Sequence, residues 1–194
     1  PVLEKFNAYT PEDGLQGYEY NFGASSKDNE GNIYFGGTNG LNCFRPDSIF
    51  NNTYQAQILF TGLQILNRDI FPGELNNYSV DLNYLDTISF LPGQNTFSFE
   101  FTATNFINSN KNQYAYMLVG LDTSWQFIGT RHFISFTTVP PGRYTLLLKA
   151  SNNDQLWSTH VRKLVINVLP FYYETITFKV GIWMLSLGTL SALF

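Results

Sequence analysis

The side chains that most often carry catalysis are few in this sequence and lie far apart along it. His132 and His160 fall in or beside strand-like runs, and Cys43 is the only cysteine. A nucleophilic mechanism needs a base beside a serine or cysteine, and no motif predicts such a pair. With one cysteine, an internal disulfide and a zinc site built from several cysteines are excluded. We interpret both histidines as surface or hydrogen-bonded residues.

Acidic side chains offer a second kind of chemistry, the hydrolysis of glycosides by two facing carboxylates. Glu12, Asp13, Glu19 and Glu100 are each interpreted as turn or surface residues. The glycine-rich run 36–40 lacks the lysine of a phosphate-binding loop and predicts a hairpin turn instead. The sequence therefore predicts no catalytic site, no metal site and no cofactor.

The composition of the 194-residue chain suits short strands better than surface helices. Charged residues make up 13% of it and aromatic residues 17%. Surface helices favour Glu, Lys and Ala, whereas aromatic residues and threonine favour strands. The net charge is −4 and no basic cluster is present, so the electrostatic surface that nucleic acid requires is missing.

Residues 1–52 carry closely spaced turn signals. The pairs at 13–14 and 39–40 are Asp-Gly and Asn-Gly, and another turn follows at 29–31. Such pairs favour hairpins because both residues adopt positive φ at low cost. Four short strands with this punctuation would make one blade of a β-propeller.

This part of the chain resembles the closing blade of the two-component regulator propeller. The family patterns DGL, E-[FY]-N and G-x-[IL]-Y-F-G-G-x-x-G-L-x-x-F-x-P match residues 13–15, 19–21 and 31–46. The resemblance covers about a quarter of the chain and implies that residues 1–52 are the C-terminal part of a β-propeller.

From about residue 53 the turn signals are more widely spaced and the predicted strands are longer. Phe97, Phe99 and Phe101 alternate with polar residues, and a period of two predicts a half-buried strand. Strands are predicted at residues 57–66, 86–91, 96–102, 113–121, 131–138, 144–150 and 162–169, with turns at 67–69, 92–95 and 140–142. Seven or so strands, with a turn about every ten residues, predict an all-β sandwich of immunoglobulin or fibronectin type.

The same region resembles the three-tyrosine (Y_Y_Y) domain that follows such propellers in bacterial sensors. The family patterns Y-x-Y-x-L-x-G-[LF]-D-x-x-W, P-P-G-x-Y-x-[FL]-x-[VL]-[KR]-A-x-N, W-S and P-[FP]-[FWY] recur here in order. The matching residues are Tyr114, Tyr116, Leu118, Gly120, Leu121, Asp122, Trp125, Pro140, Pro141, Gly142, Tyr144, Leu146, Leu148, Lys149, Ala150, Asn152, Trp157, Ser158, Pro170, Phe171 and Tyr172. The family has Asp-Gly before the second tryptophan, whereas here Gln155 and Leu156 follow Asp154, which puts the geometry of that turn in doubt.

The aromatic side chains of this region have two interpretations. Trp125 and Trp157, in predicted loops, are able to stack on sugar rings if they are exposed. Alternatively, the tyrosines and tryptophans fill the core, because each buries a large apolar area and its polar tip finds a hydrogen-bond partner. We predict that they pack the core and its corners.

The last residues predict contact with a membrane. Residues 180–194 contain no charge, and a spanning helix needs about 20 apolar residues. A buried core helix is the alternative. The aromatic residues Phe171, Tyr172, Tyr173 and Trp183 favour a membrane interface, as does Lys179, which can extend to the headgroups. We predict a domain boundary near residue 169 and a truncated transmembrane helix within residues 170–194.

Together these features predict part of an extracytoplasmic sensor. The resemblance implies a periplasmic region, anchored in the inner membrane, that relays ligand state through the sandwich, residues 53–169, to a cytoplasmic histidine kinase. It also implies a homodimer and an oligosaccharide ligand bound by the rest of the propeller. Pro170, Phe171, Tyr172 and Tyr173 are the predicted coupling residues. The alternative is a carbohydrate-binding or spacer sandwich of a membrane-anchored polysaccharide-degrading enzyme.

Overall fold

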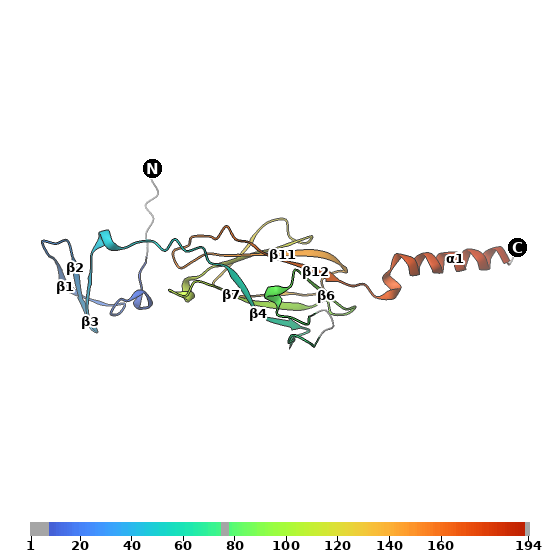
Figure 1. Cartoon of the computed structure of the whole chain (residues 1–194), viewed down its shortest axis with the longest axis horizontal. Helices are drawn as coiled ribbons and strands as arrows, with labels where there is room; N and C mark the ends of the chain where they lie inside the picture. The colour runs from blue at the N-terminus through green and yellow to red at the C-terminus, as the bar shows by residue number, and fades with distance from the viewer. Residues whose placement is uncertain (1–7, 75–77, 193–194) are drawn as a thin grey trace. The chain divides into compact units, whose positions relative to one another are not determined.

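The computed structural model describes residues 8–74 and 78–192. The chain forms two compact units that divide between Thr53 and Tyr54. Strands dominate both units, and the one α-helix among the described residues is α1, Ile176–Ala192 (Figure 1). The predicted all-β class is confirmed, and a helix lies where the start of a transmembrane helix was predicted.

Unit 1 is a small antiparallel meander. Its strands are β1 (Tyr20–Lys27), β2 (Ile33–Gly37) and β3 (Gly40–Phe44), paired in the order β1-β2-β3. The 3₁₀ turns η1 (Pro11–Asp13) and η2 (Pro46–Ser48) flank the strands. A propeller blade was expected to have four strands, and the described residues show three. None of the described residues of unit 1 is buried, because a single sheet covers neither of its own faces.

Unit 2 is a sandwich of a four-stranded and a five-stranded sheet. The first has the order β10-β7-β4-β5 and the second β6-β12-β11-β8-β9. The bounds are β4 (Ile58–Ile65), β5 (Arg68–Asp69), β6 (Thr87–Phe90), β7 (Phe97–Ala103), β8 (Tyr114–Val119), β9 (Gln126–Gly129), β10 (Phe133–Phe136), β11 (Gly142–Ala150) and β12 (Arg162–Val168). The short turns η3 (Leu82–Tyr84), η4 (Ser109–Lys111) and η5 (Tyr172–Glu174) lie in the connections.

The core lies between the two sheets of unit 2. Phe97, Phe99 and Phe101 are buried on one face of β7, as their period of two predicted. They pack against residues of the other sheet; the Phe90 and Phe97 rings, for example, have centroids 4.3 Å apart. Alternate residues of β11 and β12 complete this interior: Tyr144, Leu146, Leu148, Ala150, Leu164, Ile166 and Val168.

Two local predictions need correction. Strand β9 was not predicted, because residues 126–129 show no alternation of apolar and polar side chains. The turn expected at residues 67–69 is instead formed by Leu66 and Asn67, and Arg68 already pairs with Ile65. Both turn residues have positive φ, 51° and 62°, which is the geometry of a two-residue hairpin. Leucine is a poor residue for that conformation, since its β-carbon approaches the following carbonyl.

The helix α1 is mainly apolar, and Lys179 is its one charged residue. Among residues 8–74 and 78–192, no helix is both long enough and apolar enough to cross a membrane. The last two residues of the predicted membrane segment, 193 and 194, lie outside the described residues.

We expect Leu66→Asn to raise the free energy of unfolding by about 1 kcal/mol, because asparagine tolerates the left-handed conformation that strains leucine. The exposed leucine side chain contributes little burial that would offset this gain. Chemical denaturation measures the difference. The control Asn67→Ala, which puts an unsuitable residue at the other positive φ, should lower stability. Equal or lower stability of Leu66→Asn would contradict the assignment of strain.

Candidate functional site

Two of the three signature tyrosines are buried and hydrogen-bonded at the core of the sandwich. The Tyr114 hydroxyl accepts a bond from the backbone N–H of Ala103 at 3.2 Å and so ties the two sheets together. The Tyr144 hydroxyl donates to the carbonyl of Pro140 at 3.0 Å, which closes the turn before β11. Both residues belong to the core, as predicted.

Tyr116 lies at the margin of the core. Its ring meets that of Phe136 edge to face, with centroids 5.7 Å apart, and partial burial raises the pKa of its hydroxyl. It is half-buried and packs against the core cluster from β8. The third tyrosine therefore joins the two sheets through ring packing.

The signature turn after β8 is shaped by Gly120 and Asp122. The Asp122 carboxylate accepts a bond from the backbone N–H of Leu118 at 2.8 Å. Gly120 has φ of 108°, and a β-carbon there would lie 2.8 Å from Cδ1 of Tyr144. Any other residue would both strain the backbone and collide with the ring, which explains glycine at this position of the pattern.

The two signature tryptophans lie outside the core, so the prediction that they fill it is wrong. Trp125 and Trp157 are half-buried against the ammonium of Lys149, whose Nζ lies 4.2 Å and 5.3 Å from their ring centroids. The ring of Phe127, on β9, is 5.4 Å from the same Nζ. Lys149 alternates with buried residues of β11 and so faces outward, which brings the rings to the outer side of the sheet.

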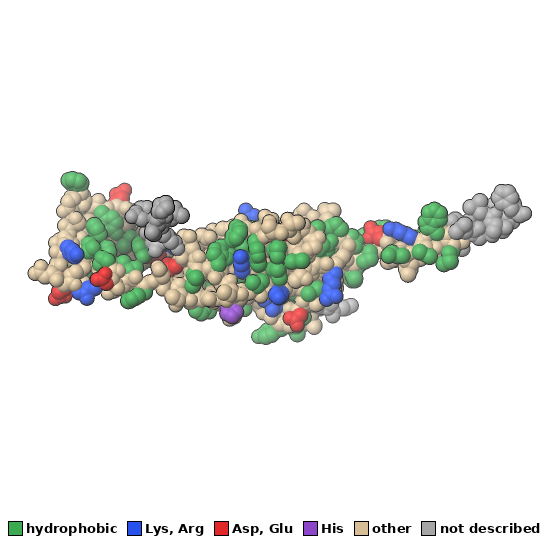
Figure 2. All heavy atoms as spheres, turned by 90° about the horizontal axis from the view of Figure 1, so that it is seen from above, with side chains coloured by type: hydrophobic (Ala, Val, Ile, Leu, Met, Phe, Trp, Pro, Cys, Tyr) green, Lys and Arg blue, Asp and Glu red, His purple; other side chains and the backbone are tan. Residues whose placement is uncertain are grey.

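This cluster of Lys149, Trp125, Phe127 and Trp157 fastens three separate segments to β11. It holds the loop after β8, the edge strand β9 and the β11–β12 loop. An ammonium above aromatic faces is attracted by their quadrupoles. No sequence periodicity signals this arrangement, because the four residues meet only after the strands have paired. Figure 2 shows Lys and Arg side chains among hydrophobic ones on one face of unit 2.

The β11–β12 loop is also hydrogen-bonded to the first residues of unit 2. The buried Asn152 donates from Nδ2 to the carbonyl of Tyr54 at 3.0 Å. The side-chain oxygen of Gln55 accepts two bonds from Thr159, 3.1 Å from its N–H and 2.7 Å from its hydroxyl. Sequence reasoning missed these contacts, since about a hundred residues separate the partners. We call the Tyr54–Asn152 and Gln55–Thr159 bonds the arrival contacts.

The turn within this loop, where the sequence departs from the family pattern, is closed by the side chain of Asn152. Asn152 accepts bonds at Oδ1 from the N–H groups of Asp154 and Leu156, both at 3.0 Å. Gln155 has φ of 62° at the position where the family has glycine. Gln155 thus adopts the left-handed conformation, which glycine adopts more readily.

The segment that leaves β12 is ordered by local bonds. The N–H of Leu169 donates to the carbonyl of Phe90 at 3.0 Å. The Phe171 N–H donates to the carboxylate of Glu174 at 3.0 Å, and the Phe171 and Tyr173 rings stack with centroids 5.2 Å apart. The Thr175 hydroxyl donates to the carbonyl of Tyr172 at 2.6 Å. Of the predicted coupling residues, Phe171, Tyr172 and Tyr173 thus take part in one structured turn before α1.

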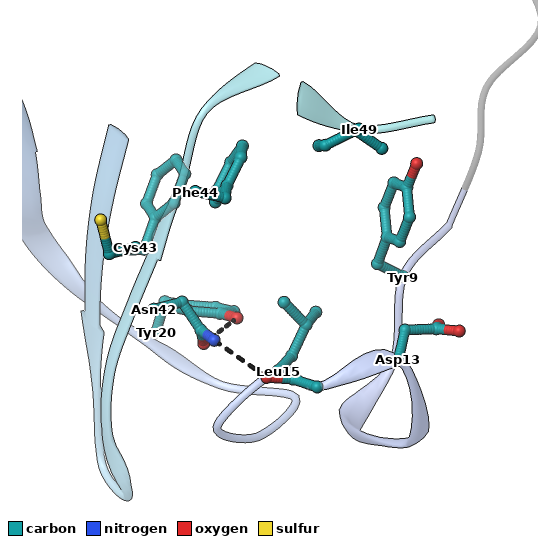
Figure 3. Close-up of a pocket in the computed structure, with 10 residues that line it drawn as sticks. Tyr9, Asp13, Leu15, Tyr20, Asn42, Cys43, Phe44 and Ile49 are labelled. Carbon is teal, nitrogen blue, oxygen red and sulfur yellow. Dashed lines mark hydrogen bonds between the residues drawn. The ribbon is translucent and has the colours of Figure 1, made fainter. Parts of the chain in front are cut away.

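In unit 1 a cavity of about 690 Å³ opens on one face of the sheet (Figure 3). Its lining is mainly apolar and aromatic and includes Leu15, Phe35, Phe44 and Ile49. Asn42 is the central polar group: it accepts a bond from the Tyr20 hydroxyl at 3.0 Å and donates to the carbonyl of Gly14 at 3.2 Å.

The β1–β2 turn of unit 1 is organised by one carboxylate. Asp28 accepts bonds from the backbone N–H and side-chain amide of Asn32 and from the hydroxyl of Tyr34. These bonds, led by that of the Asn32 side chain, lower the pKa of Asp28 to about 2. The bond to Asp28 is the main cause that raises the pKa of Tyr34 to about 12.

The remaining candidate groups do not assemble into a site. His132 and His160 are exposed. Glu12 and Asp13 both accept bonds from the hydroxyl of Thr10 at the start of η1. Within the described parts of the chain, no three His, Cys, Asp or Glu side chains are close enough together to hold a metal ion.

Comparison with known proteins identifies a family and a relative to which this chain is similar. Residues 105–169 match the family described as the Y_Y_Y domain. A histidine kinase of Formosa agariphila, named Histidine kinase P4, is 33% identical over 163 residues, which are 84% of this chain and 12% of that protein. The chain carries the Y_Y_Y domain of a two-component sensor region.

Solved structures agree with this assignment. The extracellular domain of a B. thetaiotaomicron protein assigned to the hybrid two-component systems is 31% identical, with a TM-score of 0.68 over 84% of this chain and 22% of that one. A second extracellular domain from B. thetaiotaomicron is 25% identical, with a TM-score of 0.55 over 80% of this chain and 21% of that one. The chain thus spans about an eighth of the kinase and a fifth of each sensor domain.

Lys149 should stabilise the Y_Y_Y domain through its charge. We expect Lys149→Met, which keeps a similar stem, to lower the free energy of unfolding by about 1 kcal/mol, because the cation–π attraction is lost. Lys149→Arg retains a cation above the rings and should lose less. Urea denaturation of the three proteins compares them. If Met and Arg variants are equally stable, the cluster is held by apolar contact alone.

The Asp28 turn should weaken in acid. Its pKa of about 2 lies below the ordinary value of 3.8, so its stabilising effect is present above pH 4 and is lost as the pH falls towards 2. NMR signals of the β1–β2 residues should report this opening. In Asp28→Asn the turn should be weaker at pH 6 and should show no such loss between pH 4 and pH 2. An unchanged pH dependence in that variant would exclude Asp28 as the titrating group.

Proposed function

We propose that the chain is the membrane-proximal relay of an extracytoplasmic sensor. In this proposal a propeller that ends with unit 1 senses a ligand, an oligosaccharide by the family's example, in the periplasm. The Y_Y_Y sandwich passes the ligand state to α1, which begins a transmembrane helix in the inner membrane, and a cytoplasmic histidine kinase responds. The receptor acts as a homodimer. In this proposal the two units themselves carry no catalysis.

The β11–β12 hairpin carries the proposal. Its loop contacts the segment by which the chain enters unit 2, and its other end leads to the segment by which the chain leaves the sandwich. At its loop, the arrival contacts hold the first residues of unit 2. At its other end, β12 runs into Leu169 and the turn before α1. Seven consecutive residue pairs join β11 to β12 between these ends. A displacement of residues 54–55 is therefore delivered to a stiff element that leads directly to the exit.

The structured exit supports transmission of movement. A flexible linker between β12 and α1 would absorb a displacement, whereas the bonds around η5 close the connection into one turn. Rigid-body movement of a domain that is tied to a helix in this way is a common form of signal transfer. The proposal requires that the helix moves with the sandwich.

Unit 1 has the character expected of a blade that needs neighbours. The described residues of its sheet include no buried side chain, and its cavity is lined by aromatic and aliphatic groups. A propeller blade buries such faces against adjacent blades. The match to the family's closing-blade patterns and this open apolar face together support a propeller before the sandwich.

The alternative, a carbohydrate-binding sandwich, is less well supported by the side chains that would serve it. Trp125 and Trp157, the side chains that would stack on a sugar, are half-buried, and their rings surround the Nζ of Lys149. That contact gives them a role within the fold. The similarity to sensor regions also favours the relay.

Insertion of a flexible Gly/Ser linker after Pro170 in the full-length receptor should uncouple sensing from kinase output. The physical reason is that the inserted residues would absorb the movement of β12. Autophosphorylation in inner-membrane vesicles, with and without a panel of polysaccharide-derived oligosaccharides, measures the response. The insertion variant should lose the ligand-dependent change and keep ligand binding.

A matched insertion tests whether the position matters. The same linker placed between Gly129 and Thr130, at the exposed end of β9 and outside the β11–β12 path, should leave the response intact. A normal response in the Pro170 variant would contradict the relay. If the unmodified receptor responds to none of the oligosaccharides, the proposed ligand class is wrong. If it has no kinase activity, the proposed sensor function is refuted.

A further inference from the structure

Several loops of the sandwich converge at the end from which the chain leaves β12. The N–H of Leu66 donates to the carbonyl of Thr96 at 2.9 Å, and the N–H of Val139 donates to the carbonyl of Asn95 at 2.9 Å. Phe90, which precedes the 91–94 turn, accepts the bond from Leu169. These bonds place the 66–67, 91–96 and 138–142 loops beside the exit, and we call this region the exit end.

Large apolar side chains are exposed at the exit end. Leu66 is 59% exposed, Leu91 54% and Tyr172 73%, and Leu169 is also exposed. We call these four residues the exit-end surface. They come from three different connections, so no single amphipathic element explains why they share one end of the domain. Several large apolar residues exposed at one end of a domain are a reason to test that end as an interaction surface.

Folding does not account for Leu66 at the tip of its hairpin. The residue combines high exposure with a φ of 51°, so the side chain gains little burial and the backbone is strained. Asparagine or glycine suits this position better in a protein that only has to fold. A strained residue at an exposed tip is a reason to look for a function there.

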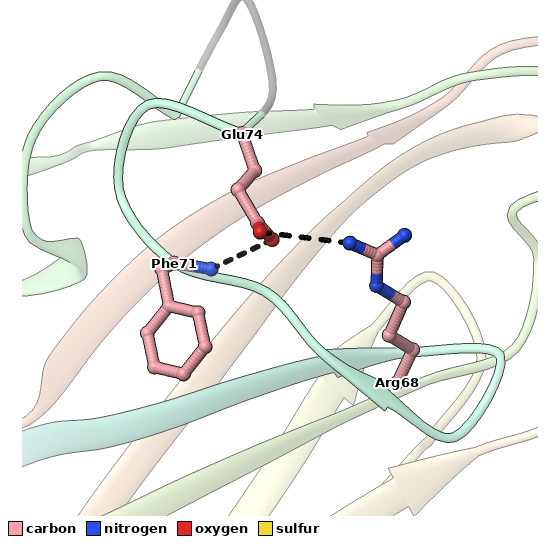
Figure 4. A network of polar contacts seen from close by, with 3 residues as sticks. All are labelled: Arg68, Phe71 and Glu74. Atoms are coloured by element: carbon pink, nitrogen blue, oxygen red, sulfur yellow. Dashed lines mark hydrogen bonds and ion pairs between the residues drawn. The ribbon is translucent and has the colours of Figure 1, made fainter.

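The same loop carries a long cation beside the apolar tip. Arg68 follows the turn and is 76% exposed, and its guanidinium lies 3.6 Å from Glu74 (Figure 4). Glu74 also accepts a bond from the N–H of Phe71. An exposed pair of this kind contributes little to stability. Breaking this ion pair therefore costs little, so Arg68 is able to turn towards another anion.

The connection to α1 holds the exit end close to the start of the helix. Phe171 lies against the 91–94 turn, since a β-carbon on Gly93 would be 3.4 Å from its ring. The η5 turn then shortens the path to Ile176, where α1 begins. Whatever surface receives the first turn of α1 is therefore within reach of Leu91 and its neighbours.

We propose that the exit-end surface inserts into the headgroup region of the lipid bilayer. This inference rests on the proposed function, in which α1 enters the membrane. Leucine and tyrosine side chains at the polar–apolar boundary of a bilayer bury apolar area while the backbone stays hydrated, and an arginine beside them can meet lipid phosphate. Leu169 and Tyr172 lie in the connection that leads to the mainly apolar α1, which favours lipid over a second copy of the chain as the occupant of this surface.

Site-directed spin labelling tests this contact. Leu66→Cys, Leu91→Cys and, in α1, Ile182→Cys are labelled one at a time in full-length protein that carries Cys43→Ser and no other cysteine. The protein is studied in detergent and in vesicles of phosphatidylethanolamine and phosphatidylglycerol. Transfer to vesicles should lower the access of a water-soluble nickel chelate to the labels at 66 and 91 and preserve their access to oxygen, which partitions into lipid.

The matched control is Phe106→Cys. Phe106 is 78% exposed and lies beyond the end of β7 that is opposite the 91–96 loop. The seven residues of β7 span roughly 23 Å, which separates Phe106 from that loop. Its nickel access should be the same in detergent and in vesicles. This label separates contact with lipid from a general effect of reconstitution.

The possible outcomes are distinct. If the label at 182 is in lipid and those at 66 and 91 remain open to nickel, the surface proposal is overturned while the membrane anchor stands. If the label at 182 is also open to nickel, the anchor itself fails. If the labels at 66 and 91 are shielded from both nickel and oxygen, a protein interface covers them and lipid is the wrong partner.

Discussion

The backbone pairing of β11 with its two neighbours is the interaction on which the sandwich depends. β11 is antiparallel to both β12 and β8, with seven registered pairs on one side and six on the other. This register sends Tyr144, Leu146 and Leu148 into the core and Lys149 outward. A shift by one residue would exchange the two faces, exposing the buried residues and burying the lysine. The core, the cluster around Lys149 and the arrival contacts therefore all depend on the register of β11.

Residues with local patterns could be predicted well. The alternation of Phe97, Phe99 and Phe101 needs no partner to be recognised, because a strand with one buried face has a period of two. The same reasoning located β11 and β12 and their buried residues. Strand β9 was not predicted because an edge strand buries few side chains, so its apolar and polar residues do not alternate strongly.

Features that depend on distant partners could not be predicted. The parallel pairing of β6 with β12 joins Thr87 to Val165, and neither segment reveals the other. Trp125 and Trp157 were assigned to the core because of their size, whereas a cation on the outer face determines their position. The arrival contacts belong to the same class, since amide side chains such as Gln55 and Asn152 occur in many loops without such partners.

The two residues with unfavourable φ in hairpin loops of unit 2 show how differently strain is used. Gln155 stands where the family pattern has glycine, and Asn152 holds that turn by accepting two bonds, so the surrounding loop determines its conformation. Leu66 sits in a two-residue turn fixed mainly by the pairing of Ile65 with Arg68. The first departure is compensated within the loop at the arrival end, and the second is left exposed at the exit end. Leu66 is therefore the strained residue whose exposure the proposed lipid contact would explain, because the chain runs from this end of the domain into the mainly apolar α1.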